Sequence, residues 1–408
     1  MRYLIIGFLM LLSVPAAFAA QGMSLEDAEK LFLENNLELK AHKAELGKYD
    51  AGVIEAGLLP NPSFNYSLES VENGDRETEE VYSISQPVDI VRKRGLRTDV
   101  ARKRRDARHL LFEQETLNAL TELKQTYYRI LYLRENETSL KGILDTFSDV
   151  RQKTEERLKA GDVAEVELLR LSNESKRFLR ALERLTSEIN AETGKLALML
   201  NISMGDIVLK DSLAPAPLGY SRDELIAKAM EKRGDVRAAS AQIDAAGNAL
   251  TLSKREAVGP VEVAAGYKRR TGGFNGFAFG VSVPLPFFNR NQGGIAAAKA
   301  ELEAERLNLE QLKKKAASEV ATRADRAAFN ADRVAQLSGQ LTTANEITNS
   351  IRAAYDEGEA SLIELLDAVR SERELLMERN EAVYDYWTTL FELEKATGMK
   401  LTKSGGAQ

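Results

Sequence analysis

The chain has 408 residues, of which 44% are hydrophobic and 29% are charged. Its 56 basic and 62 acidic residues give a net charge of −6, which speaks against a general attraction to nucleic acid. The absence of cysteine excludes disulfides, thiolate metal sites and cysteine nucleophiles. The two histidines, His42 and His109, are far apart in the sequence, so we predict no catalytic site, no metal site and no cofactor.

The first twenty residues have the anatomy of an export signal. Arg2 precedes an apolar run, which ends in the small-residue string AAFAA at residues 16–20. We therefore predict a signal peptide over residues 1–20. No later apolar segment approaches the roughly 20 residues that a membrane-spanning helix needs. A mature chain that crosses a membrane therefore has to cross it as β-strands.

The rest of the sequence is an internal duplication with a constant spacing of 197 residues. Three pairs of equivalent residues mark it: Ser24 and Ser221, Pro87 and Pro284, and Gly161 and Gly358. Between the copies, Pro215 and Pro217 indicate a linker. We predict four segments after the signal peptide: a first repeat at 21–200, a connector at 201–220, a second repeat at 221–399 and a flexible tail at 400–408.

Each repeat opens with a pattern that starts a helix. A serine is followed three residues later by an acid, as in a capping box, at Ser24–Asp27 and at Ser221–Glu224. We predict one helix from each start, ending before Pro60 in the first repeat and before Gly259 in the second.

Two short alternating segments follow in each repeat. Apolar and polar side chains alternate at residues 61–70, 80–90, 261–268 and 276–283, and polar tips join the members of each pair, as in β-hairpins. Strands of about ten residues are long enough to cross a bilayer when they are tilted. Alternation alone also fits two half-buried hairpins of a soluble protein.

Long helices complete each repeat. No proline occurs at 88–214 or after residue 286, so we predict a helix of about 60 residues before Gly161 and another before Gly358, each followed by a return helix. The first return helix carries a heptad seam of apolar residues: Leu168, Leu171, Phe178, Leu182, Leu185 and Ile189. Charged residues fill the other faces, so these helices have to pack side by side in a thin layer.

Four strands per chain are too few to close a membrane barrel, because the smallest such barrels have about eight. An open sheet edge in lipid leaves backbone groups unsatisfied, at several kcal/mol each. Strands that insert must therefore come from several copies. We predict a mainly α, internally duplicated fold in which three copies form a 12-stranded β-barrel continued by a long α-helical barrel.

Three junctions between helices and strands resemble those of a known family: AGLLPNPSF at 56–64, SQPVDIVRKRGLR at 85–97 and VSVPLPFFNRNQGGI at 281–295. The whole mature chain resembles the TolC family of outer-membrane factors. Within it, the likeness is to the outer-membrane components of heavy-metal exporters of the cobalt-zinc-cadmium, resistance-nodulation-division (RND) type.

The resemblance implies a homotrimeric channel in the bacterial outer membrane, with its helical barrel in the periplasm. It also implies two protein partners, a periplasmic adaptor and an inner-membrane RND pump, and passive conduction of heavy-metal cations. Many relatives carry a lipidated N-terminal cysteine, which this chain lacks. Contact with outer-membrane lipid would therefore rest on the barrel.

The resemblance also gives the two glycine turns a role, which is to close the channel and to meet the adaptor. It assigns adaptor docking to six residues: Gly161, Asp162, Val163, Gly358, Glu359 and Ala360. A plain helical turn explains the same glycines without any partner.

Two acids just past the second turn are candidates for a channel constriction. Glu364 and Asp367 lie on one helical face, so a trimer would form two carboxylate rings, in which crowding raises pKa values and ionised groups favour cations. The resemblance aligns them with the family's acidic constriction, where aspartate usually occupies the first position, and Tyr355 with a gate residue. Ala360 replaces an arginine that locks the gate in relatives, and Glu167 matches that arginine's partner, so this lock is not expected. A solvated acidic face is the alternative.

Two other classes of protein fit parts of the pattern. A periplasmic coiled-coil adaptor or scaffold shares the helical hairpins and the export signal, but the duplicated element order disfavours it. An enzyme fits least, because no nucleophile and base are grouped. For a channel, drugs or proteins exported by type I secretion are the alternative cargo. The basic cluster at 92–105 lacks stacking aromatics, so we predict no nucleic-acid site. A trimeric duct would place the cluster just inside the membrane interface, where long cationic side chains can reach lipid headgroups or the lumen. For most of these charges we predict a solvated helix face.

Overall fold

The computed structural model describes residues 22–73, 75–215, 219–273 and 275–401. The predicted signal peptide lies outside the described residues, as do most of the predicted tail and residues 216–218 of the predicted connector. The chain divides into two compact units. The sheet unit comprises residues 41–114 and 234–315, and the hairpin unit comprises the remaining described residues.

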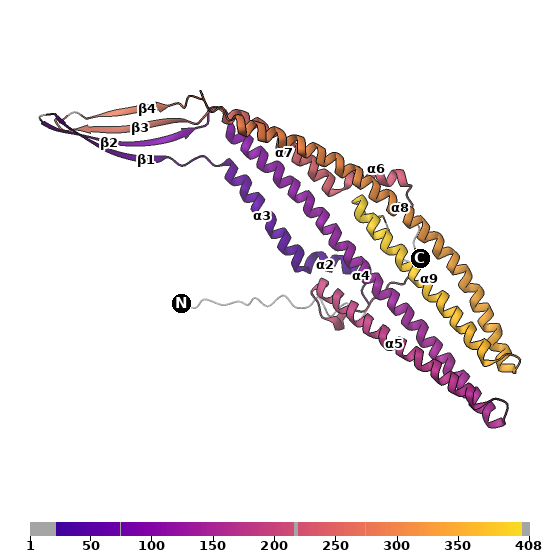
Figure 1. Ribbon diagram of the computed structural model, residues 1–408. Coiled ribbons are helices and arrows are strands. Elements are labelled where there is room, and N and C mark those ends of the chain that lie inside the picture. Colours follow the sequence, from indigo (N-terminus) through magenta and orange to yellow (C-terminus); the bar gives the residue numbers. More distant parts are fainter. Residues whose placement is uncertain (1–21, 74, 216–218, 274, 402–408) are drawn as a thin grey trace, which may run out of the picture. The chain divides into compact units, whose positions relative to one another are not determined.

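The sheet unit contains four antiparallel strands in the order β1-β2-β3-β4 (Figure 1). Their bounds are Ser63–Asn73 for β1, Asp75–Val88 for β2, Val261–Arg270 for β3 and Asn275–Ser282 for β4. Four helices adjoin them: α3 (Leu37–Gly57) before β1, α4 (Lys93–Ala160) after β2, α7 (Gly234–Glu256) before β3 and α8 (Gln292–Glu357) after β4. The four predicted strands are confirmed, and β2 pairs with β3 so that the two hairpins form one sheet.

A row of aromatic side chains crosses this sheet. The strand register places Tyr66 opposite Tyr82, Tyr82 opposite Tyr267, and Tyr267 opposite Phe277. The ring centroids are 5.0 Å apart in the first of these pairs and 5.8 Å apart in the last. Phe279 on the same face is 83% exposed in the single chain. One face of the sheet therefore presents aromatic and apolar side chains to its surroundings.

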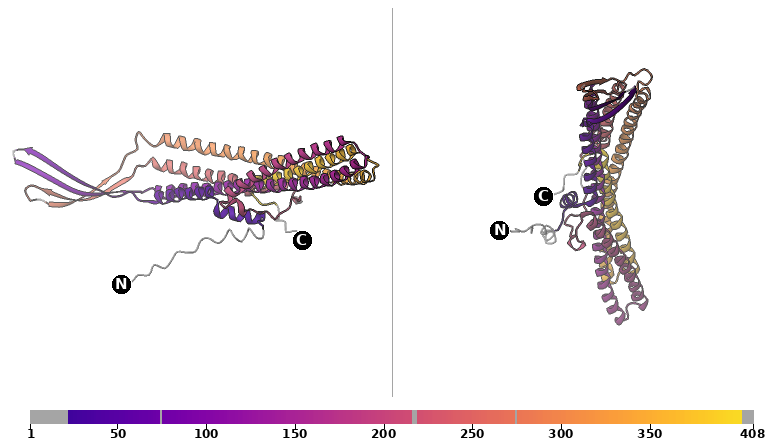
Figure 2. Two further views of the ribbon diagram at one scale, coloured as in Figure 1. Left: turned by 90° about the horizontal axis from the view of Figure 1, so that it is seen from below. Right: turned by 90° about the vertical axis from the view of Figure 1, so that its left-hand side faces the viewer.

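The hairpin unit consists mainly of long helices that turn back on themselves (Figure 2). Its elements are α2 (Leu25–Asn35), the second part of α4, α5 (Glu165–Leu200), the 3-10 turn η2 (Met204–Asp206), α6 (Arg222–Lys232), the second part of α8 and α9 (Leu362–Thr397). The predicted seam of α5 is confirmed, because Leu171, Phe178 and Leu185 are buried in a core shared with α4, α8 and α9. The ring of Phe178 lies 5.2 Å from that of Phe147 in α4.

Among the described residues, no helix combines the length and the apolarity that crossing a bilayer requires.

The first helix of each repeat is broken, so the prediction of one continuous helix is wrong. Asn36 separates α2 from α3, and Arg233 separates α6 from α7, with ψ angles of 121° and 126° in place of helical values. Hydrogen bonds of the side chain stabilise the first break. The Asn36 amide donates to the Met199 carbonyl at 3.0 Å, and its oxygen accepts the Leu39 N–H at 2.9 Å, which caps α3.

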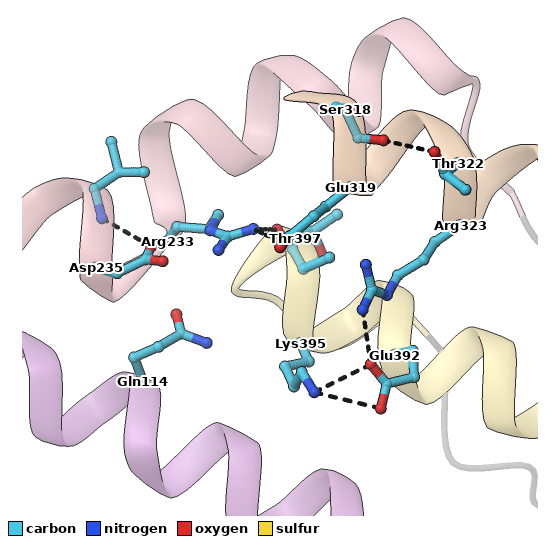
Figure 3. A network of polar contacts seen from close by, with 12 residues as sticks. Gln114, Arg233, Asp235, Ser318, Glu319, Thr322, Arg323, Glu392, Lys395 and Thr397 are labelled. Carbon is cyan, nitrogen blue, oxygen red and sulfur yellow. Dashed lines mark hydrogen bonds and ion pairs between the residues drawn. The ribbon is translucent and has the colours of Figure 1, made fainter. Parts of the chain in front are cut away.

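Arg233 makes the equivalent connection in the second repeat. Its guanidinium donates to the Ala396 carbonyl at 3.2 Å and to the Glu319 carboxylate at 2.9 Å (Figure 3). Met199 and Ala396 are again 197 residues apart. Each broken helix is therefore tied at its break to the end of the return helix of its own repeat. The spacing of 197 residues therefore relates these tertiary contacts as well as the starts of the helices.

A buried ion cluster in the hairpin unit joins α2 to the last described residues of the chain. The side chain of Lys124 is 5% exposed and lies 2.7 Å from Glu394, which is 1% exposed, and 3.1 Å from Glu29. Lys400 pairs with Glu29 at 3.2 Å, and the N–H of Leu401 donates to Glu394 at 2.8 Å. The cluster holds α2 and the segment after α9 against α4.

Candidate functional site

The two glycine turns join the long helices of the hairpin unit. Gly161 and Gly358 have φ angles of 87° and 84°, in the left-handed region that glycine adopts without strain. In both turns the next N–H, of Asp162 or Glu359, donates to a carbonyl five residues earlier, at 2.9 and 2.8 Å. Four of the predicted docking residues are exposed: Gly161, Asp162, Gly358 and Glu359. The other two, Val163 and Ala360, are partly buried.

Tyr355, the predicted gate residue, is 1% exposed and connects α8 to the end of α4. Its hydroxyl lies 2.8 Å from the Thr154 hydroxyl, and the Arg157 guanidinium lies 5.4 Å from its ring centroid. Lys153 and Asp356 add an ion pair at 2.6 Å. Sequence reasoning missed Thr154 and Arg157, because no local pattern marks a contact between residues 201 positions apart.

Glu364 acts as a helix-capping residue within the chain. Its carboxylate accepts the N–H of Ser361 at 2.8 Å and the hydroxyl of Ser361 at 2.9 Å. These two hydrogen bonds hold the pKa of Glu364 below its ordinary value of 4.5. The pKa of Glu364 is therefore lowered within one chain, whereas crowding of carboxylates between copies is expected to raise it. Asp367 lies three residues further along α9 and is exposed.

Glu167 is equivalent to Glu364 in the first repeat, but its environment differs. Ala164 occupies the position of Ser361, so α5 begins without a side-chain cap and Glu167 lacks a serine partner. Glu364 therefore belongs to a capping box, whereas Glu167 does not.

A third acid, Glu174, is buried nearby and neutralised. Arg370 donates to its carboxylate twice, at 3.0 and 2.7 Å, and Arg177 donates once at 3.2 Å. The hydrogen bonds from Arg370 lower the pKa of Glu174, despite the opposing effect of burial. Within the described ranges, no group of three or more histidine, aspartate and glutamate side chains is arranged to hold a metal ion.

Ser361→Ala is expected to lower the melting temperature by about 2 °C, because it removes the cap of α9. Ala164→Ser is the matched variant and is expected to raise it by a similar amount, because it completes a capping box with Glu167. Thermal unfolding followed by circular dichroism measures both changes. Equal melting temperatures for the parent and the Ser361 variant would contradict the assignment of the cap.

The same cap is expected to weaken in acid. A carboxylate with a depressed pKa contributes stability that is present above its ordinary pKa and is lost as the pH falls through the lowered value. The difference in melting temperature between the parent and Ser361→Ala is therefore expected to be constant near neutral pH and to shrink below pH 4.5. A difference that grows on acidification would contradict the direction of the shift.

The sheet unit has two strand edges without a partner. Within the described residues, β1 pairs with β2 alone and β4 pairs with β3 alone. Since neighbouring strands alternate in direction, β1 and β4 run antiparallel to each other. The β4 edge of one copy can therefore pair with the β1 edge of another while the antiparallel alternation continues.

The helices connected to the two edge strands carry exposed seams of small and apolar residues. The α3 seam consists of Ala44, Gly47, Ala51 and Ile54, and Leu58, the first residue after α3, continues it. These residues are spaced by three and four and are all exposed. The α8 seam, Ala297, Ala300, Ala304 and Leu307, has the same spacing and is also exposed. Such spacing is typical of packed helix pairs. Because α3 precedes β1 and α8 follows β4, each of these helices is connected directly to an edge strand of the sheet.

Comparisons with known proteins agree with this architecture. The pattern of the outer membrane efflux protein family matches residues 30–201 and 225–399. The cobalt-zinc-cadmium resistance protein CzcC of Cupriavidus metallidurans is 24% identical over 86% of this chain and 84% of its own length. The nickel-cobalt-cadmium resistance protein NccC of Alcaligenes xylosoxydans xylosoxydans is 24% identical over 72% and 69%.

A crystal structure of CusC, a protein that forms a transmembrane channel, covers 92% of both chains with a TM-score of 0.74 and 17% identity. The family pattern matches twice, once in each half, and leaves out the segment between residues 201 and 225. This chain belongs to the outer membrane efflux protein family.

Proposed function

We propose that three copies of this chain close into an outer-membrane duct through which heavy-metal cations leave the cell. The observation that carries this proposal is the pair of unpartnered edges on the sheet unit. Pairing of β4 with β1 satisfies the backbone groups that an open sheet would leave exposed in lipid. The same pairing brings the α8 seam of one copy against the α3 seam of the next.

The number of copies follows from the need for a hollow interior. Two copies supply eight strands, and side chains fill the interior of an eight-stranded barrel. Three copies supply twelve strands, which is the smallest closed set built from this chain that leaves a lumen. A head-to-tail contact between identical copies closes into a ring when the rotation fits.

The cargo is inferred from the relatives. CzcC and NccC are named for resistance to cobalt, zinc, nickel and cadmium, and they match most of this chain. Acidic residues at the second turn, Glu364 and Asp367, form rings in a trimer and favour cations over anions. The channel residues supply no energy source, so an inner-membrane RND pump drives export through a periplasmic adaptor.

The adaptor docks at the two glycine turns. Gly161, Asp162, Gly358 and Glu359 are exposed there, and Tyr355 fixes the second turn against α4 through Thr154. The contact of Tyr355 with Thr154 holds the second turn in place, so that its exposed residues are positioned to bind the adaptor. The constriction contains Glu364 and Asp367 from each copy, with Tyr355 and Glu167 close to the turns.

Gene deletion followed by metal challenge tests the proposed cargo. We expect the deletion strain to accumulate zinc, cobalt, nickel or cadmium and to lose tolerance of that metal, and the parent gene to restore both. The control is complementation with the Asn308→Glu variant, which changes an exposed α8 residue next to the seam. This variant should restore metal tolerance as the parent gene does. Loss of drug tolerance or protein secretion alone, with metal tolerance unchanged, would contradict metal export.

A further inference from the structure

We propose that the groove where β2 joins α4 binds an anionic phospholipid of the inner leaflet of the outer membrane. This inference rests on the proposed function, because it requires the strands to stand in a bilayer. The groove has a volume of about 400 Å³ and lies within the sheet unit. Its lining combines apolar residues before β1 and after β2 with the basic first turns of α4.

The apolar part of the groove is open in the single chain. Leu59 is 60% exposed, Ile90 is 57% exposed and Val88 is 38% exposed. Val88 is the last residue of β2, so this surface continues the apolar row of the strand toward the helices. An acyl chain that lies along the sheet would end beside these residues.

The basic residues of the junction divide into two groups. Lys93 donates to the Val258 carbonyl, and Arg255 donates to the Val91 carbonyl at 2.9 Å, so these two cations fix the connecting loops. The guanidinium groups of Arg94 and Arg97 make no such bond with any described residue, although both line the groove. They are available for a ligand.

The charge of the remaining groups favours an anion. Asp89 lines the groove, but its carboxylate accepts the backbone N–H of Arg94 at 2.7 Å and is occupied as a cap of α4. Glu256 is an exposed carboxylate of the lining and opposes the two arginines in part. Arginine side chains bind phosphate through paired N–H groups, while their alkyl stems lie on apolar surface.

These features match a lipid headgroup at the membrane surface. The phosphate would lie against Arg94 and Arg97, and the acyl chain would lie on Leu59 and Ile90. A free phosphate ion has no apolar group that could pack on Leu59 and Ile90, whereas a phospholipid has acyl chains. Phosphatidylglycerol keeps a net negative charge at its headgroup, whereas the ammonium of phosphatidylethanolamine offsets its phosphate, so the site should prefer the former.

A binding experiment with purified protein tests this preference. The protein is placed in nanodiscs of phosphatidylethanolamine with increasing phosphatidylglycerol, and retained lipid is counted by native mass spectrometry. We expect preferential retention of phosphatidylglycerol, with a loss of about fivefold for each charge removed by Arg94→Gln or Arg97→Gln. The control is Arg102→Gln, since Arg102 is exposed and paired with Asp99 at 3.4 Å. Equal retention of both lipids, or an equal effect of the control, would overturn the site.

A second measurement separates this site from the proposed function. Trp387 is the single tryptophan of the chain, so Trp387→Phe gives a background without tryptophan fluorescence. Ile90→Trp in that background is expected to be quenched by phospholipids brominated near the headgroup. Phe277→Trp on the exposed face of β4 reports on the bilayer itself. Quenching at 277 without quenching at 90 would overturn the lipid site alone, and absence of quenching at both would overturn the membrane insertion on which it rests.

Discussion

Leu307→Glu is expected to leave each chain folded and to prevent assembly. Leu307 is 58% exposed in the single chain and is the largest residue of the α8 seam. Packing against α3 of the next copy would remove the new carboxylate from water without a partner, which costs about 3 kcal/mol at each interface. Three interfaces carry the same substitution in a closed ring, so we expect the trimer to be lost. Size-exclusion chromatography with light scattering in detergent measures the mass.

Asn308→Glu provides the comparison. It adds the same charge one residue away, about 100° around the helix, at another exposed position. We expect this variant to form trimers like the parent. The parent, Leu307→Glu and Asn308→Glu should all show the same circular dichroism spectrum. A trimeric Leu307→Glu variant would show that α8 does not contribute its exposed seam to a contact between copies.

Glu394→Ala is expected to destabilise the hairpin unit by about 3–5 kcal/mol. The substitution leaves the buried ammonium of Lys124 without its 2.7 Å partner, and it removes the acceptor of the Leu401 N–H. Glu29 still lies 3.1 Å from Lys124, so we expect a loss toward the lower end of this range. Urea unfolding followed by circular dichroism measures the free energy.

Two further variants identify the cause of this loss. Glu310→Ala breaks a pair with Lys314 whose side chains are 62% and 76% exposed, so its effect should stay below about 1 kcal/mol. Lys124→Met combined with Glu394→Leu removes both charges and should recover most of the stability, because an apolar pair needs no desolvation of ions. A double variant as unstable as Glu394→Ala would show that the loss of this partner of the Lys124 ammonium is not the cause.

Much of the fold was predictable because its signals are local. Alternation at 61–70 and 276–283 predicted strands, and the absence of proline after residue 286 predicted the long helices around Gly358. The family match confirms the predicted family and its outer-membrane location. Pairing of β2 with β3 was not predicted, because its partners, from Val88 with Val261 to Glu79 with Arg270, are far apart in the sequence and no local pattern marks the contact.

The helix breaks were missed for a related reason. Asn36 interrupts a sequence that reads as continuous helix, and the hydrogen bond that compensates it reaches Met199 in another element. The contact of Tyr355 with Thr154 is equally long-range. The cap formed by Ser361 and Glu364 is different, because it has the same serine-to-acid spacing that predicted the helix start at Ser24. That local signal was present and could have identified the cap.

Cysteine cross-linking of neighbouring copies tests the shared wall most directly. The chain contains no cysteine, so Ala51→Cys and Ala300→Cys can be introduced together, one on each seam and each in the part of its helix that is nearer in sequence to the sheet. Oxidation in native outer membranes should convert the protein into a covalently closed trimer on a denaturing gel, while either single variant stays monomeric. Monomers alone from the double variant, under conditions that oxidise an exposed control pair, would contradict a duct built from three copies.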